Sequence, residues 1–206
     1  AAVLLGTVYP TVAQLGTVTA DVAPLFRKLT VGGASGTQTL SVASTTLSVG
    51  LTQAMDVNAN GVLSLGGTGQ IGGAGTINVA GAFNWSGGGT LSGSGGKLSV
   101  AGTAALVGTA TALTLTNGYT LEIGGVATWS GSTLNFINTG FGATLRVLSG
   151  GVLNVTGTNS ISYNLGGTAP LFDNLGTVNR TTSTGGGLVQ RFGLEVEHFG
   201  GDTVRL

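Results

Sequence analysis

The feature that most constrains the fold is a recurring triplet, in which two apolar residues flank one small polar residue. Successive triplets start about seven to eight residues apart, and turns rich in Gly, Ser, Thr and Asn separate them. This alternation is typical of a short strand that buries one face. The triplets occupy 40–42, 47–49, 55–57, 63–65, 77–79, 83–85, 98–100, 113–115, 121–123, 134–136, 145–147, 153–155 and 161–163, with apolar residues at 71, 91 and 105–107 filling the gaps.

Strands this short cannot form long antiparallel hairpins, but they can form the sides of a coil that stacks on itself. Three such sides give a coil of about 22 residues. The two tryptophans, Trp85 and Trp129, occur in similar phrases 44 residues apart, which is two coils. We therefore predict an all-β fold, a single-stranded parallel β-helix (β-solenoid) with three short strands per coil and an extended N-terminal arm or cap.

Composition agrees with this architecture and excludes several others. The chain has 40 glycines, which suit tight corners, but only 3 prolines, so a collagen helix is excluded. Charged residues make up 7% of the chain and the net charge is zero, which disfavours nucleic-acid binding. No apolar run is long enough to span a bilayer as a helix, and the absence of cysteine excludes disulfides. A surface with so few charges is more stable when neighbours cover it.

The chain divides into three predicted segments. Residues 1–36 contain two Leu-Gly-Thr-Val phrases and form an N-terminal arm or cap, a candidate donor strand. Residues 37–170 form the solenoid core, and residues 171–206 form terminal coils that hold half of the charges. If the arm is donated to another copy, the apolar side chains that mediate assembly are Val3, Leu4, Leu5, Val8, Tyr9, Val12, Leu15, Val18 and Phe26.

Four aromatic residues fall in or beside the tryptophan phrases. They are Phe83, Trp85, Trp129 and Phe136. Each is an apolar member of a strand pattern, so we interpret them as core or intersubunit stacking residues rather than as a sugar-binding platform.

No catalytic, cofactor-binding or metal-binding residues are predicted. The densest polar cluster is Glu195, Glu197 and His198; its paired carboxylates fit a glycosidase or lyase in principle, but a solvated strand face explains them equally. The predicted core holds only two acids, Asp56 and Glu122, too few for a polysaccharide-active β-helix. Threonine pairs such as those at 109 and 111 form no regular ladder, so ice binding is also disfavoured.

The phrases Trp85-Ser86-Gly87-Gly88 and Asn174-Leu175-Gly176-Thr177-Val178-Asn179-Arg180 resemble the repeats of large bacterial surface proteins. These are the filamentous-haemagglutinin-like and autotransporter-like parallel β-helix adhesins. The resemblance covers roughly residues 63–206. It implies a right-handed coil, an extracellular or cell-surface location, and no catalytic residues to transfer.

Two functions are compatible with these observations. In the first, the chain is the structural subunit of an extracellular bacterial filament or surface fibre, and its partners are copies of itself. In the second, it is a stalk or binding segment of a large secreted adhesin, with surface glycans or other cells as partners. The sparse charge, the distinct arm and the strand pattern up to the last residue favour the first.

Overall fold

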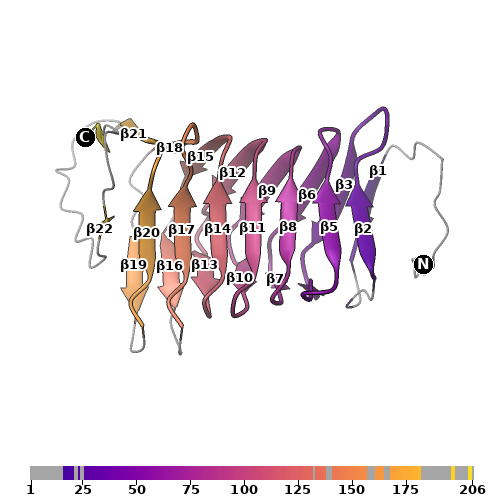
Figure 1. Cartoon of the computed structure of the whole chain (residues 1–206), viewed down its shortest axis with the longest axis horizontal. Helices are drawn as coiled ribbons and strands as arrows, with labels where there is room; N and C mark the ends of the chain where they lie inside the picture. Colours follow the sequence, from indigo (N-terminus) through magenta and orange to yellow (C-terminus); the bar gives the residue numbers. More distant parts are fainter. Residues whose placement is uncertain are drawn as a thin grey trace.

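The computed structural model shows a β-solenoid, which confirms the predicted fold class. It describes residues 16–20, 23, 26–131, 133–137, 141–156, 161–164, 168–181, 196–197 and 204–205. All secondary structure in this part of the chain is β-strand, arranged in three parallel sheets that we name A, B and C. The coils stack along the long axis, with the two ends of the chain at opposite ends of the stack (Figure 1).

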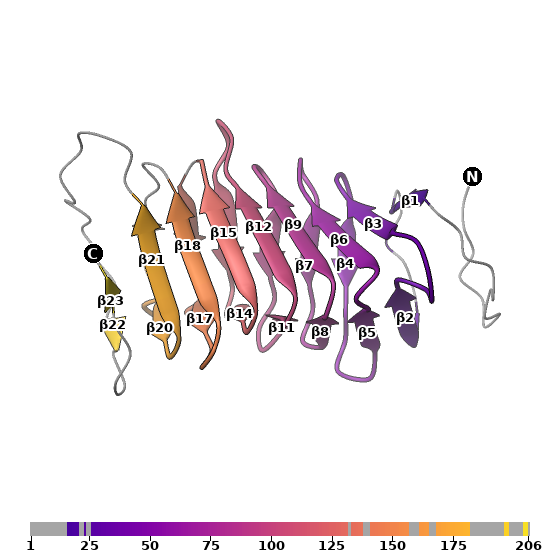
Figure 2. The same ribbon diagram turned by 90° about the horizontal axis from the view of Figure 1, so that it is seen from above.

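Sheet A is the longest of the three and lies on the face seen in Figure 2. Its strands, in spatial order, are β1 (Gly16–Thr19), β3 (Gln38–Val42), β6 (Gly61–Leu65), β9 (Ala82–Ser86), β12 (Thr103–Val107), β15 (Val126–Ser130), β18 (Val152–Thr156), β21 (Thr177–Thr181) and β23 (Val204–Arg205).

Sheets B and C form the other two sides of the coil. Sheet B contains β2 (Lys28–Val31), β5 (Ala54–Val57), β8 (Thr76–Val79), β11 (Lys97–Val100), β14 (Thr120–Ile123), β17 (Thr144–Val147), β20 (Leu171–Asn174) and β22 (Val196–Glu197). Sheet C contains β4 (Thr46–Ser48), β7 (Gln70–Gly72), β10 (Thr90–Ser92), β13 (Leu113–Thr116), β16 (Leu134–Ile137) and β19 (Ile161–Asn164).

Each coil contributes one strand to each sheet, and about six coils of roughly 23 residues stack in register. The length of a coil varies along the chain: Val62 pairs with Ala82, 20 residues later, whereas Val126 pairs with Val152, 26 residues later. The strands keep their register because the extra residues lie in the corners between them.

The core consists of columns, by which we mean residues that occupy the same register position in successive coils. In one column Trp85 pairs with Leu106, which pairs with Trp129, so the tryptophans lie on one side two layers apart, as their spacing predicts. All three side chains are buried. Apolar side chains thus stack on apolar side chains along the axis, which is why alternation in the sequence produces a continuous core.

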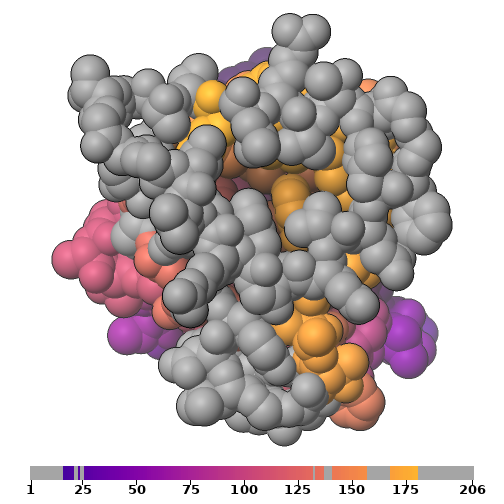
Figure 3. Space-filling model, turned by 90° about the vertical axis from the view of Figure 1, so that its left-hand side faces the viewer, coloured from indigo at the N-terminus to yellow at the C-terminus, as the bar shows by residue number. Residues whose placement is uncertain are grey.

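Both predicted end segments contain strands of the same solenoid. Strands β1 and β2 fall within residues 1–36 and pair in parallel with β3 and β5. Strands β20 and β21 fall within residues 171–206 and continue sheets B and A, at the end that Figure 3 views along the axis. The described part of each end segment therefore extends the coil.

Glycines line the corner at which the chain passes from sheet B to sheet A. They occupy one column: Gly61, Gly81, Gly102, Gly125, Gly151 and Gly176. A Cβ atom on Gly102 would collide with the carbonyl oxygens of Gly81 and Ala80 in the coil before it. Only a residue without a side chain allows successive coils to approach this closely.

Candidate assembly surfaces

The outer face of sheet B carries most of the charge in the described part of the chain. Its strands hold seven charged residues: Lys28, Asp56, Lys97, Glu122, Arg146, Asp173 and Glu197. Asp56, Glu122, Arg146, Asp173 and Glu197 all belong to one column, because their strands pair at these positions or through the intervening coils. This charged column runs along the front of the solenoid in Figure 1.

The central part of this column is an ion-pair ladder. Lys97 Nζ lies 3.1 Å from a carboxylate oxygen of Glu122, and Arg146 Nη1 lies 3.4 Å from the other. The Nε of Arg146 also donates to Asp173 Oδ2 at 2.6 Å. Both carboxylates are buried, so the cations compensate for the water that these groups have lost. The ladder links four successive coils and has no acid left without a cation.

The outer face of sheet A is free of charge over the eight strands from β1 to β21; the ninth strand, β23, has Arg205 in register with Asn179. Every outward position from β1 to β21 holds Thr, Ser, Asn, Val or Ala. We call this surface the neutral face. Figure 2 shows that its strands lie side by side along the whole stack. Polar contacts within it include the hydrogen bond that Asn179 Nδ2 donates to Asn154 Oδ1 at 3.0 Å.

Two valines are unusually exposed on the neutral face. The side chains of Val107, on β12, and Val126, on β15, are 42% and 49% exposed. Their strands are neighbours in sheet A, and β12 is the fifth of its nine strands. Val126 pairs with Thr103 and Val107 pairs with Ser130, so the two valines lie at opposite ends of their strands, about 13 Å apart along the strand direction.

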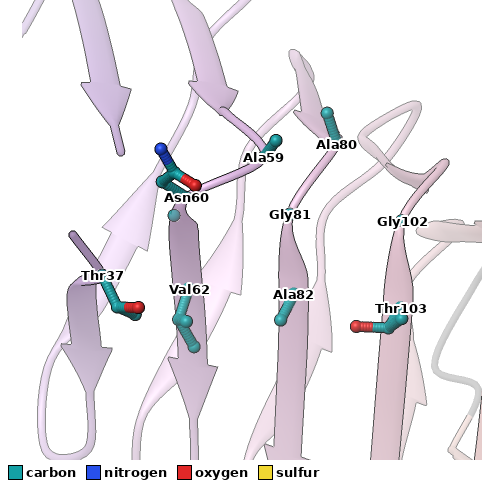
Figure 4. A pocket seen from close by; sticks show the side chains of 10 residues that line it. Thr37, Ala59, Asn60, Val62, Ala80, Gly81, Ala82, Gly102 and Thr103 are labelled. Carbon is teal, nitrogen blue, oxygen red and sulfur yellow. The ribbon is translucent and has the colours of Figure 1, made fainter. Parts of the chain in front are cut away.

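A shallow hollow adjoins the neutral face at the glycine corner. It has a volume of about 300 Å³ and is lined by uncharged residues, among them Thr37, Asn60, Val62, Ala82 and Thr103. Figure 4 shows Val62, Ala82 and Thr103 side by side on successive strands, below the corner glycines. The hollow exists because the glycine column has no side chains to fill it. Its lining carries no charge and no group suited to acid–base chemistry.

The N-terminal end of the stack presents strand edges. Among the described residues, no strand pairs with the outer edges of β1, β2 and β4. Val18, on β1, occupies the same core column as Leu40 but is 47% exposed. This end therefore offers both unpaired backbone groups and core side chains to whatever lies next to it.

The predicted assembly residues fall in different places. Val18 lies at the exposed end just described, whereas Phe26 is buried in the core. The remaining seven predicted assembly residues lie in residues 1–15, outside the described part of the chain. The four aromatic residues predicted to stack all lie in the core: Phe83, Trp85, Trp129 and Phe136. Phe83 and Trp85 contact each other with ring centroids 6.2 Å apart.

The described structure places only some of the polar residues that the sequence singled out. Asp56 accepts a hydrogen bond from Asn78 and lies on a different coil from Glu122. Glu197 lies in register with Asp173, and Glu195 and His198 are outside the described residues. Over the described ranges, no three histidine, cysteine, aspartate or glutamate side chains are placed to hold a metal ion. The same ranges contain no helix long and apolar enough to cross a membrane.

Among the described residues, the side chains of Tyr119 and Asn174 each have a buried polar atom without a hydrogen-bond partner. The hydroxyl of Tyr119 lies in the core, and burial raises the pKa of this phenol above its ordinary value of 10.0. The unpartnered atom of Asn174 is Nδ2, although its Oδ1 accepts a bond from the amide of Gly176 at 3.3 Å. Neither residue lines the hollow at the glycine corner.

Comparison of the chain with protein-family models, with curated proteins and with solved structures found no match.

Sequence reasoning missed the charged column and the neutral face. The sequence contains a pattern that indicates both. Asp56, Glu122 and Arg146 are each the polar residue in the middle of a triplet, and their triplets recur at every third strand or a multiple of it. Assigning every third triplet to one side of the coil would have placed these charges on a single sheet.

Proposed function

We propose that this chain is a structural subunit of an extracellular bacterial filament or surface fibre, in which β-solenoids stack end to end. The observation that carries the proposal is the parallel register of all three sheets, together with the edges of β1, β2 and β4 that no other described strand pairs with. In a parallel ladder the edge at one end complements the edge at the other. Such a contact is heterologous and does not close, so it generates a filament.

Charge favours head-to-tail over head-to-head contact. At the N-terminal end of sheet B, the Lys28 side chain is 68% exposed and lies 3.9 Å from its carboxylate neighbour Asp56. At the other end of the same sheet, the last described positions of the charged column are Asp173 and Glu197. Stacking in register would bring the basic end of one copy to the acidic end of the next, which is the complementarity that selects orientation.

Two further observations support an extracellular structural role. The chain resembles the repeats of bacterial β-helix surface proteins, and its residues 1–15 contain one of the two Leu-Gly-Thr-Val phrases. The second phrase includes β1, which is a strand of sheet A. By analogy, the first phrase is suited to add as a strand to the exposed edge of another copy.

A proline at the outer edge of β1 tests the stacking directly. The amide of Ala20 donates to the Ser41 carbonyl in β3. Because successive amides of a strand point to opposite sides, the amide of Thr17 points to the unpaired edge. Thr17→Pro therefore removes a donor on the edge of β1 that no described strand pairs with, a position at which an edge strand tolerates proline. Thr17→Val is the matched control, because it keeps the amide.

We expect the unaltered chain and Thr17→Val to form filaments in negative-stain micrographs. Thr17→Pro should give discrete particles with an unchanged circular-dichroism spectrum and melting temperature. Removal of residues 1–15 separates strand donation from simple stacking, since it leaves β1 and the buried Phe26 in place. Discrete monomers of the unaltered chain at high concentration would contradict the proposal and favour the stalk of a larger adhesin.

A further inference from the structure

We infer that the neutral face of sheet A is a lateral contact surface, on which a second copy of this chain packs face to face. This contact is a side-to-side one, so it is additional to end-to-end stacking and does not depend on it. The occupant follows from four properties of the face: its lack of charge, the position of its two exposed valines, its area and the size of its side chains.

The first property is the separation of charge between the sheets. A contact through sheet B would bury Lys97, Glu122 and Arg146 against like charges on the partner, and desolvating charges is costly. A contact between two neutral faces buries only hydroxyl, amide and aliphatic groups. Depletion of charge is also what distinguishes the centre of protein interfaces from the remaining surface.

The second property is the position of Val107 and Val126. They lie on neighbouring strands near the middle of the stack, but at opposite ends of those strands. A two-fold axis parallel to the long axis of the stack would bring Val107 of each copy next to Val126 of the other, one strand apart, which is an isologous contact.

The third property is the area of the neutral face. The eight uncharged strands from β1 to β21, spaced about 4.8 Å apart, extend about 34 Å, and five residues at about 3.3 Å each extend about 16 Å. The face therefore measures about 540 Å², so a face-to-face pair would bury about 1,100 Å² in total. That value is just above the roughly 1,000 Å² that a specific interface requires. A single pair would be weak, and a series of pairs along two stacked fibres would be strengthened by multivalency.

The fourth property is the small size of the outward side chains, none of which is larger than valine or asparagine. Two such sheets can approach closely, as the facing sheets of a sandwich do. A sugar partner is less well matched, because the neutral face has no outward aromatic side chain in the described strands on which a sugar ring could stack.

A charge placed at the centre of the neutral face tests the inference. Thr128, on β15, is exposed and lies beside Ala105 and Asn154 in its column. We would introduce Thr128→Lys into the Thr17→Pro chain, so that stacking does not obscure the result. The matched control is Thr144→Lys on sheet B, which repeats the Lys97–Glu122 arrangement two coils further along, next to Asp173.

Sedimentation velocity should show a concentration-dependent dimer for Thr17→Pro and for the control. Thr128→Lys should raise the dimer dissociation constant at least tenfold. A mixture of Thr128→Lys and Thr128→Glu chains should restore the dimer, because the opposite charges then face each other, and this rescue excludes misfolding as the cause.

Three results would overturn the inference. One is a monomeric Thr17→Pro chain at the highest accessible concentration, and another is a dimer that Thr128→Lys does not weaken. The third is binding of the neutral face, as a monomer, to ice crystals or to immobilised glycans. Failure of the unaltered chain to form filaments would contradict only the proposed stacking, since the dimer is measured separately.

Discussion

Gly125 and its neighbour Gly124 show how closely the coils pack at one corner. A Cβ atom on Gly125 would collide with the carbonyl oxygens of Gly102 and Ala101, in the coil before it. A Cβ atom on Gly124 would make ordinary contacts, at 3.4 Å from the Leu148 side chain and 3.5 Å from the Val100 carbonyl. The two glycines are adjacent in sequence, but only one is required by the packing.

We therefore predict that Gly125→Ala lowers the free energy of unfolding by about 1–3 kcal/mol, because a rigid backbone must move to accommodate the methyl group. Gly124→Ala should change it by less than about 0.5 kcal/mol. Urea denaturation followed by circular dichroism measures both. Equal effects of the two substitutions would show that the backbone preference of alanine over glycine, rather than the corner contact, determines the loss in the free energy of unfolding.

The buried side chain of Tyr119 allows a second prediction about the free energy of unfolding. Its hydroxyl is buried without a hydrogen-bond partner, so folding removes it from water and provides no bond in exchange. Phenylalanine has no hydroxyl and therefore avoids this penalty. Tyr119→Phe should raise the free energy of unfolding by about 1 kcal/mol. A decrease of that size would instead show that the hydroxyl has a partner, such as a bound water.

The same phenol makes the stability of the folded state depend on pH. Burial raises the pKa of Tyr119 in the folded chain above 10.0, while the unfolded chain keeps the ordinary value. The unfolded chain therefore loses this proton first as the pH rises, and the folded state is penalised above about pH 10. Unaltered protein should lose stability between pH 10 and 12 more steeply than Tyr119→Phe, in parallel urea titrations at each pH.

At the scale of the strand, the ion-pair ladder couples β11, β14, β17 and β20. Arg146 is its central member, since it contacts both Glu122 and Asp173. Without Arg146, two buried carboxylates would lie two coils apart with only Lys97 as a cation. The ladder also favours one register, because a slip of one coil would place Glu122 opposite Asp173.

We predict that Arg146→Ala lowers the free energy of unfolding by about 1–3 kcal/mol, the range for hydrogen bonds to charged groups. Lys28→Ala should change it by less than about 0.5 kcal/mol, since that pair is long and exposed. Urea denaturation in low and high salt measures the difference. Comparable effects of the two substitutions would contradict the structural role of the buried ladder.

The same strands show what the sequence could and could not predict. Triplets such as those of β3, β6 and β14 specify strand and burial locally, so the solenoid and its three sides could be predicted. The ladder depends on which residues 24 to 27 positions apart are aligned, and the coil length varies between 20 and 27 residues. Tyr119 follows Asn117 and Gly118, both at positive φ, so in the sequence it looks like a turn residue rather than a core residue.

The whole molecule behaves as a stack in which each coil contacts only its neighbours. A prediction at this scale is that one complete coil can be removed. Deleting residues 81–101 joins Ala80 to Gly102 and brings β6 next to β12, and β8 next to β14, with apolar columns aligned.

This shortened chain should fold, with a parallel-sheet circular-dichroism spectrum and resistance to protease, because stability in such stacks is a sum over neighbouring units. Deleting residues 82–91, which is about half a coil, should abolish folding, because every later strand would move to another side. If both deletions fold equally well, the coil is not the structural unit.

The direction of the hydrogen bonds has a mechanical consequence. In all three sheets the bonds between strands run along the long axis, from each coil to the next. A chain pulled by its two ends would therefore peel from a terminal coil, with the bonds of that coil breaking one after another rather than together. Each coil of about 23 residues that unfolds would lengthen the chain by about 70 Å. Under tension, the solenoid should yield in regular steps at low force and recoil when the load is removed.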